Sequence, residues 1–305
     1  MAGSVLITGA NGSLGIHAVD RILREHPNST AILTVRNLSD ADANTKRLQE
    51  TIARYPGAKA SIHSLDLSNL TAVHEFAEKV AQDIANEVHP PLSAIVANAY
   101  YWNLVADPEI TGDGYDKTFQ VGHIAHPGKN GLEKYPPTIP DDLELLAKPK
   151  AGANKMGLGF QRYANTKLVT VSWMYALNRH LQKGANLSKI TAVAINPGNL
   201  VDSRALRVNT PGMLPLLQKF VLRPLMPLMR LRDPTMRQAS AAGVDVAKLA
   251  VDQEYAGARG YYTLLKEDES SPESKDEKKQ EVLWVHSARW AGINKENTSL
   301  AAAIV

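Results

Sequence analysis

Short apolar runs alternate with longer amphipathic stretches through the first two hundred residues. The runs at 4–8, 30–36 and 92–99 are apolar at successive positions, which is typical of parallel strands buried on both faces. The stretches between them repeat their apolar residues with the spacing of a helix. This alternation predicts an α/β fold: a doubly wound parallel sheet with right-handed crossovers in a single domain.

The alternation stops between residues 127 and 162. This stretch is rich in proline and glycine and contains no run typical of a buried strand. A helix at 163–182 and a strand at 189–198 follow. We therefore expect no strand between those at 92–99 and 189–198, and we expect the two to pair directly across the gap.

The C-terminal third contains two segments of unusual composition. Residues 204–237 are apolar, proline-punctuated and basic, with seven Lys or Arg and one acid, Asp233. We interpret them as a lid of short helices over an apolar pocket, because the prolines should interrupt a long amphipathic face. A peripheral membrane contact through 213–231 is the alternative. Residues 266–281 form a charge run that we expect to be exposed.

Composition narrows the class of protein. The net charge of +3 over 305 residues is too small to suggest a nucleic-acid partner, and the absence of cysteine excludes disulfides and thiolate chemistry. No apolar run reaches the roughly 18 residues of a membrane span. The first residues enter a strand at once, so we expect no signal peptide and a cytoplasmic location.

A glycine turn follows the first strand. Gly9, Gly12 and Gly15 stand between that strand and the first helix, where a Rossmann-type fold holds a dinucleotide pyrophosphate on backbone N–H groups. NAD sites carry an acid after the second strand, but here Arg36 stands at that tip. A guanidinium suits a 2′-phosphate, so NADP(H) is favoured over NAD(H).

Tyr163 and Lys167 lie one turn apart on the helix predicted at 163–182. The same spacing occurs at Tyr55 and at Tyr262, but the first is broken by proline and glycine and the second leaves a strand. An ammonium beside a phenol lowers the tyrosine pKa and makes it a usable acid or base. The pair predicts proton-transfer chemistry.

These features together resemble the short-chain dehydrogenase/reductase family, over about Ser4 to Leu265. The resemblance rests on the glycine turn, Asp66-Leu67, Asn98-Ala99, the Tyr163/Lys167 pair and Asn196-Pro197-Gly198. The overall character of the sequence is similar to fungal members associated with secondary metabolism.

The resemblance implies roles by position. Tyr163 exchanges a proton with the substrate oxygen, and Lys167 tunes it and holds the nicotinamide ribose. The residues implied to contact the cofactor are Gly9, Asn11, Ser13, Leu14, Gly15, Arg36, Asp66, Leu67, Asn98, Tyr163, Lys167, Pro197, Gly198 and Leu200.

Departures from the family pattern are equally clear. Ser13 stands at the position of the usual middle glycine, and Gly12 comes one position early. Where the family has Asn-Ala-Gly, this chain has Asn98-Ala99-Tyr100. Gly122 aligns with the asparagine of the proton relay. No serine occurs between Ser93 and Ser172, so the family's active-site serine and its fifth strand are both missing. We interpret this as a block lost between His126 and Pro127.

Two functions follow from this balance. The first is an NADP(H)-dependent oxidoreductase acting on a carbonyl or secondary alcohol of a hydrophobic small molecule. The second is a catalytically weak or inactive dinucleotide-binding protein of the same family. We expect no metal site: His123 and His126 are spaced three apart, but no third ligand motif accompanies them. The sequence leaves the oligomeric state open.

Overall fold

The computed structural model describes residues 3–123 and 136–304. These residues group into two compact units. The first unit comprises residues up to Tyr101, Thr111–Asp113 and Pro197–Ala256; the second comprises Trp102–Ile110, Gly114–Asn196 and Gly257 onward.

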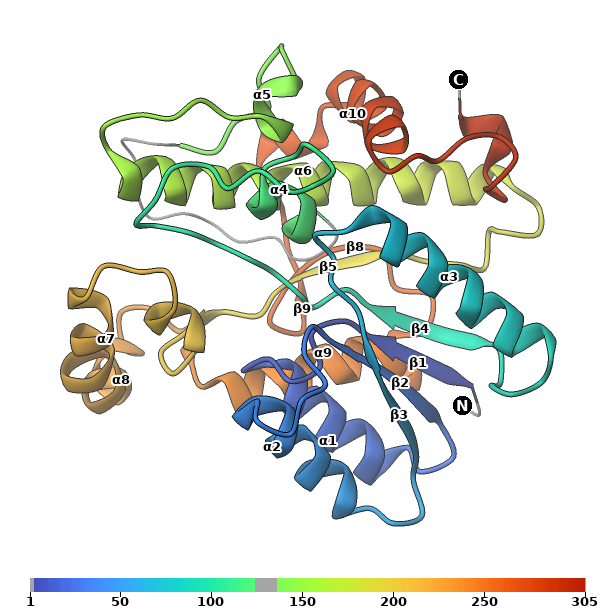
Figure 1. Ribbon diagram of the computed structural model, residues 1–305, viewed down its shortest axis with the longest axis horizontal. Helices are drawn as coiled ribbons and strands as arrows, with labels where there is room; N and C mark the ends of the chain where they lie inside the picture. Colours follow the sequence, from blue (N-terminus) through green and yellow to red (C-terminus); the bar gives the residue numbers. More distant parts are fainter. Residues whose placement is uncertain (1–2, 124–135, 305) are drawn as a thin grey trace. The chain divides into compact units, whose positions relative to one another are not determined.

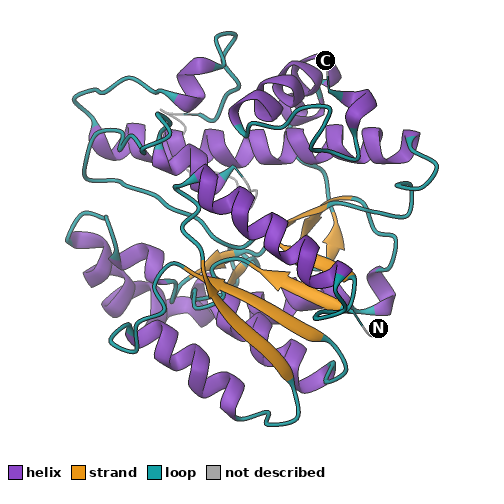
Figure 2. Cartoon of the chain, turned by 45° about the vertical axis from the view of Figure 1, so that its right-hand side comes forward, coloured by secondary structure: helices purple, strands orange, loops and turns teal. Residues whose placement is uncertain are grey.

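Four parallel strands form the sheet of the first unit, in the order β3-β2-β1-β4 (Figures 1 and 2). They are β1 (Ser4–Ile7), β2 (Thr30–Val35), β3 (Lys59–Ser64) and β4 (Leu92–Val96). Every residue of β2 is buried, as expected of a strand covered on both faces. The predicted parallel α/β sheet is confirmed.

Helices link these strands: α1 (Gly15–Glu25), α2 (Ala43–Ala53) and α3 (Leu70–Ala85). Asp42 and Asn69 cap α2 and α3 through their side-chain oxygens. A later helix, α9 (Ala239–Val251), packs closely on α1, and a Cβ at Gly243 would lie 2.5 Å from the carbonyl oxygen of Leu14. Close packing of α9 therefore fixes the start of α1, where the glycine turn ends.

The rest of the first unit is built from short elements. Two short strands, β6 (Asn199–Leu200) and β7 (Met236–Arg237), pair in parallel. Between them lie η1 (Arg204–Arg207), α7 (Met213–Leu217), a π-helical turn η2 (Gln218–Leu222) and α8 (Arg223–Met229), and η3 (Gln253–Tyr255) follows α9. Helical backbone continues from 213 to 229 with Pro227 inside α8, so the prolines do not end the helical backbone, and the lid of short helices stays a prediction.

A 29-residue helix, α6 (Lys155–Lys183), organises the second unit (Figure 1). It contacts α4 (Lys117–Gly122), α5 (Glu144–Ala147) and α10 (Glu277–Trp290). Their shared core contains Phe119, Ile139, Leu143, Leu146, Ala147, Leu168, Val169, Leu283 and Trp290. Burial of this apolar surface holds α6 in place and with it the residues that α6 carries.

A second, three-stranded sheet has the order β5-β8-β9. Here β5 (Val193–Asn196) pairs in parallel with β8 (Gly260–Thr263), which pairs in antiparallel fashion with β9 (Lys266–Glu267). The prediction that the strand near 190–195 pairs directly with the strand at 94–97 is wrong, since the sheet partner of β5 is β8. Backbone groups of β5 find their hydrogen bonds in the C-terminal strand instead.

Helix α6 begins eight residues earlier than the sequence predicted. Gly157 and Gly159, which belong to the glycine-rich stretch at 127–162, lie inside its first turns. A Cβ at Gly159 would lie 2.4 Å from the carbonyl oxygen of Asn103 and 3.1 Å from Cα of Leu104. Glycine is required there because the chain at 103–104 crosses the helix at backbone contact distance.

The charge run 266–281 is mostly exposed, but some of its polar side chains are buried. It forms β9, η4 (Pro272–Lys275) and the start of α10, and η5 (Ala301–Ala303) lies near the end of the chain. Ser274 and Gln280 are buried, and the Gln280 side chain donates to the Ser274 carbonyl oxygen. Among the described helices, none combines the length and apolar character needed to cross a bilayer.

Candidate active site

The glycine turn of the first unit brings three glycines into close backbone contact. Gly9 has a φ of +59°, and a Cβ there would lie 3.0 Å from Cα of Ala99. A Cβ at Gly15 would lie 2.7 Å from the Gly9 carbonyl oxygen and 2.9 Å from Nδ2 of Asn98. Side chains at these positions would occupy the space in which the turn folds back on itself.

Asn98 fastens this turn to the end of β4. Its backbone N–H donates to the Thr8 hydroxyl at 3.0 Å, and its side-chain amide donates to the carbonyl oxygens of Thr8 and Gly9 at 3.0 and 2.9 Å. The residue is 6% exposed. Asn98 therefore shapes the glycine turn, a role that the sequence interpretation did not include.

A relay of hydrogen bonds joins the glycine turn to the residues after β2. Asn11 Nδ2 donates to the Thr45 hydroxyl at 3.0 Å, and that hydroxyl donates to the Asn37 carbonyl oxygen at 2.7 Å. Arg36, beside Asn37, is exposed at the tip of β2. The Asp42 carboxylate, further along the same loop, accepts the N–H groups of Asn44 and Thr45 as the cap of α2.

Arg204 is a cation at the glycine turn that the sequence interpretation missed. Its guanidinium donates to the Asn11 carbonyl oxygen at 3.0 Å, and its backbone N–H donates to the Ser13 hydroxyl at 2.9 Å. Partial burial lowers its pKa from the usual arginine value, and the Arg47 charge acts in the same direction. No local signal marks this residue, because the contact spans almost two hundred residues of sequence.

The remaining cofactor candidates of this unit follow strand ends. Asp66 is exposed after β3 and accepts the Ser68 hydroxyl at 2.6 Å, and Leu67 is buried beside it. Gly198, after Pro197, has a φ of +86°, and Leu200 is half-buried in β6. Tyr100, where the family has glycine, forms a side-chain hydrogen bond with Ser203.

These residues fit a dinucleotide pyrophosphate. Helix α1 begins without a side-chain cap and without an acid in its first turn, so its first N–H groups and helix dipole favour an anion. The glycine backbone leaves a cradle that Cβ atoms would fill. Arg204 adds a positive charge at the same place. All of these groups follow the carboxyl ends of parallel strands, where open α/β sheets bind ligands.

The second unit carries the proton-transfer pair on α6. Nζ of Lys167 lies 5.0 Å from the centre of the Tyr163 ring. Lys167 is 1% exposed, and burial lowers its pKa to about 7. Tyr163 is half-buried. The predicted pairing of these two residues on one helical face is therefore present.

Trp102 is a second residue that sequence reasoning missed. Its ring meets Tyr163 edge to face at 5.5 Å and Phe160 at 5.7 Å between centroids. It is 9% exposed, and the segment that carries it is the one crossing α6 at Gly159. Trp102 thus forms one wall around the phenol.

Gly122 stands where the family pattern has the asparagine of the proton relay, and it lies close to another helix. A Cβ at Gly122 would lie 3.0 Å from Cγ2 of Thr166, so this position is closely packed against α6. Thr138, in the proline-rich stretch before α5, is exposed and donates its N–H to the Asn165 side chain. The block inferred to be lost between His126 and Pro127 lies outside the described residues and stays a prediction.

His123 belongs to an aromatic stack rather than a polar cluster. Its ring stacks on Phe119 at 5.2 Å, Nε2 lies 2.9 Å from the Ser287 hydroxyl, and burial lowers its pKa to about 4. His126 lies outside the described residues. Within the described ranges, no three His, Asp or Glu side chains are grouped so as to hold a metal ion.

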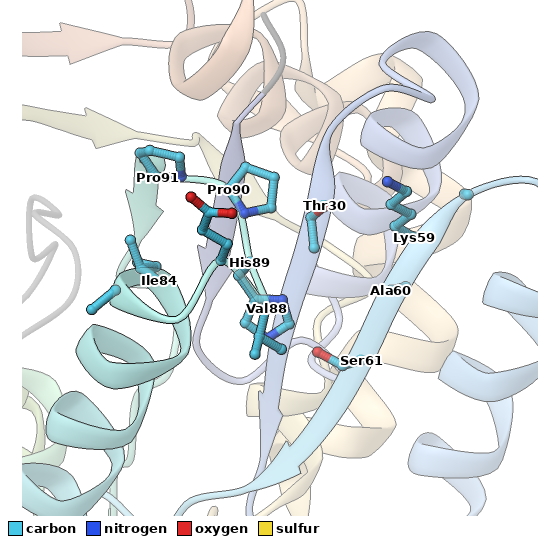
Figure 3. Close-up of a pocket in the computed structure, with 12 residues that line it drawn as sticks. Thr30, Lys59, Ala60, Ser61, Ile84, Val88, His89, Pro90 and Pro91 are labelled. Atoms are coloured by element: carbon cyan, nitrogen blue, oxygen red, sulfur yellow. The ribbon is translucent and has the colours of Figure 1, made fainter.

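An open cavity of about 850 Å³ lies at the other end of the first sheet (Figure 3). Thr30 and Lys59, the first residues of β2 and β3, line it together with the residues that follow α3. Because ligands of parallel sheets bind at the carboxyl ends of the strands, this cavity at the amino ends is not the candidate cofactor site.

Two family models match the chain: the KR domain over residues 3–120 and the AcuH dehydrogenase domain over residues 204–300. The dehydrogenase acuH of Aspergillus aculeatus is 47% identical over 30% of this chain and 95% of its own length. The short-chain dehydrogenase iccH of Talaromyces variabilis is 27% identical over 98% of both chains.

Solved structures share the fold. An NADPH-bound short-chain oxidoreductase from Pseudomonas aeruginosa, described as having an atypical catalytic center, superposes with a TM-score of 0.55 at 13% identity, over 88% of this chain and 98% of its own. The NADH complex of a 3-ketoacyl-(acyl-carrier-protein) reductase from Brucella melitensis gives 0.51 at 15% identity, over 86% and 95%. At these identities the likeness concerns the fold alone.

Proposed function

Because the chain belongs to the short-chain dehydrogenase/reductase family of oxidoreductases, we propose that it is an NADP(H)-dependent enzyme acting on a carbonyl or secondary alcohol of a hydrophobic small molecule. The observation that carries the proposal is the Tyr163/Lys167 pair, with Lys167 buried and 5.0 Å from the phenol ring. An oxidoreductase of this family needs a positioned proton donor, and this pair supplies one.

The cofactor part of the proposal rests on the first unit. Gly9, Leu14 and Gly15 would hold the pyrophosphate with Arg204, and Asp66 and Leu67 would hold the adenine. Arg36 would meet the 2′-phosphate, which favours NADP(H). Solved relatives of the fold that carry NADPH or NADH support a nicotinamide dinucleotide in general. When bound, the nicotinamide supplies or accepts the hydride.

The chain's own residues move the proton. In the reductive direction, Tyr163 donates its phenolic proton to the substrate oxygen as negative charge develops there. The Lys167 ammonium stabilises the phenolate that remains. Trp102 restricts the phenol ring and keeps water from that side. Pro197, Gly198 and Leu200 would border the nicotinamide in the working enzyme.

The substrate and its setting follow from the C-terminal segment and the relatives. Residues 204–237 form short helices rich in apolar side chains, which suits a lid over a hydrophobic substrate within a single domain of residues 1–305. Fungal relatives such as iccH and acuH support a role in secondary metabolism. We propose a cytoplasmic location.

A catalytically weak dinucleotide-binding protein is the second candidate. It is favoured by the absence of serine between Ser93 and Ser172, together with the close packing at Gly122. Without a serine donor, the developing oxyanion loses a hydrogen bond, a loss that typically costs about 10²–10³ in rate.

One pair of measurements separates the two candidates. NADPH binding is measured by calorimetry, and NADPH oxidation is followed with a panel of apolar ketones, with Tyr163→Phe as the control. Turnover that disappears in Tyr163→Phe supports the oxidoreductase. Tight binding with turnover equal to that of Tyr163→Phe supports the second candidate, and absence of nucleotide binding contradicts both.

A further inference from the structure

Large apolar side chains are concentrated on the surface of residues 213–231, here named the 213–231 segment. Met213 is 69% exposed, Phe220 63%, Leu228 65% and Leu231 83%, and Leu216, Leu217 and Leu225 are also exposed. Most of them lie on α7 and α8, which η2 joins into one continuous helical stretch. Contiguous apolar surface of this kind marks an interaction site in a folded protein.

The charge of the segment is of one sign. Lys219, Arg223 and Arg230 are exposed between the apolar residues, and Arg232 follows directly. No acid occurs from Ser203 to Arg232. The next acid, Asp233, is already engaged, since its carboxylate accepts the N–H and hydroxyl of Thr235 and the side-chain amide of Asn199.

One buried residue anchors the segment, and the residues around it are half-buried or exposed. Gln218 is 2% exposed, and its side-chain amide donates to the Ser203 carbonyl oxygen at 2.8 Å. The π-helical turn at 218–222 separates α7 from α8, and Pro224 and Pro227 both lie within α8. Exposed apolar residues therefore lie on both sides of this anchored position.

We propose that the 213–231 segment docks on an anionic lipid surface. Apolar side chains such as Phe220 and Leu228 would enter the boundary between headgroups and acyl chains, and the Lys and Arg side chains would meet lipid phosphates. The positive charge of the segment favours a membrane over a second copy of the chain as its partner. A second copy placed face to face would bring two basic surfaces together, which opposes association, whereas a negative membrane attracts both the charges and the apolar residues.

The test is sedimentation of the full chain with large unilamellar vesicles of phosphatidylcholine alone or with roughly one-third phosphatidylserine, the anionic lipid of such surfaces. We expect binding to the mixed vesicles that weakens as salt is raised. A Lys219→Glu/Arg223→Glu variant should bind at least about 10-fold more weakly, because each basic residue near the surface contributes appreciably. The Phe220→Ser/Leu228→Ser variant should bind more weakly without changing the salt dependence.

Val88→Ser is the matched control, since Val88 is 63% exposed in the same unit but outside the segment. Phe220→Trp adds a reporter whose emission should shift to the blue on mixed vesicles. Circular dichroism and melting temperature establish that each variant is folded. Equal binding by Phe220→Ser/Leu228→Ser and wild type overturns the proposal, as does absence of binding. A dimer in solution that Phe220→Ser/Leu228→Ser dissociates also overturns it in favour of a second copy.

Discussion

Nζ of Lys167 lies 5.0 Å from the centre of the Tyr163 ring, one turn along the same helix. The lysine is almost fully buried, and burial lowers its pKa to about 7. Its charge therefore changes within the physiological range, unlike that of an exposed lysine. This relationship links the local helix geometry of α6 to the chemistry proposed for the chain.

Replacing Tyr163 by phenylalanine should remove turnover while leaving the fold intact and NADPH binding measurable. The phenol is the proposed proton donor, and such groups contribute about 10²–10⁴-fold to rate. Steady-state NADPH oxidation and calorimetric NADPH titration of the same preparation provide the measurement. A Tyr163→Phe protein that turns over at the wild-type rate would contradict the catalytic assignment.

The rate of carbonyl reduction should fall as pH rises through about 7. Lys167 has a pKa lowered to about 7 by burial, so above that pH it loses the charge that stabilises the Tyr163 phenolate. Lys167→Met should lower the rate and abolish this step in the pH profile of kcat/KM. Lys183→Met, at the exposed end of the same helix, is the control and should keep the wild-type profile.

Arg36 and Arg204 should affect nucleotide binding in different ways. Arg36→Ala should weaken NADPH binding about 10-fold or more and leave NADH unchanged, because only the 2′-phosphate is proposed to meet it. Arg204→Ala should weaken both nucleotides alike, since its guanidinium lies at the glycine turn, 3.0 Å from the Asn11 carbonyl oxygen. Titrations of NADPH and NADH into both variants measure these changes in affinity. Equal affinity of the wild-type chain for NADPH and NADH would refute the predicted preference.

Asp116 should make stability fall as pH rises between about 4 and 6. This cap of α4 is 1% exposed, and burial raises its pKa to about 6. The unfolded chain loses the proton near its ordinary pKa, whereas the folded chain keeps it until about pH 6. The free energy of unfolding therefore falls by about 2 kcal/mol between pH 4 and pH 7 because of this group.

Asp116→Asn keeps an oxygen that can cap the N–H of Phe119 but cannot ionise. Urea unfolding at pH 4.5 and 7.5 should therefore show a smaller difference in the free energy of unfolding for the variant than for wild type. The same difference in both proteins would show that the Asp116 carboxyl is not the group responsible.

Gly159→Ala should destabilise the second unit by about 1–2 kcal/mol. The added Cβ would lie 2.4 Å from the Asn103 carbonyl oxygen, and this overpacking outweighs the helix propensity gained from alanine. Gly57→Ala is the control, because a Cβ there has no neighbour within 4 Å. Thermal unfolding of both variants tests the difference, and equal melting temperatures would mean that the 103–104 crossing is not closely packed.

Features that depend on neighbouring residues in the chain could be predicted from the amino-acid sequence. Hydrophobic periodicity identified β1 to β4 and the helices between them, because a strand or helix repeats its apolar positions over a few residues. The glycine turn and the Tyr163/Lys167 pair were equally readable, since a βα turn and an i, i+4 pair are local.

Features that depend on partners far away in the sequence became visible only in the folded chain. Gly157 and Gly159 look like helix breakers, yet the crossing segment at 103–104 makes glycine the residue that fits. Arg204 reaches Asn11, and β5 pairs with β8, through chain paths that no local pattern encodes. The physical reason is the same in each case: packing and hydrogen bonding between residues far apart in sequence override the local preference of the chain.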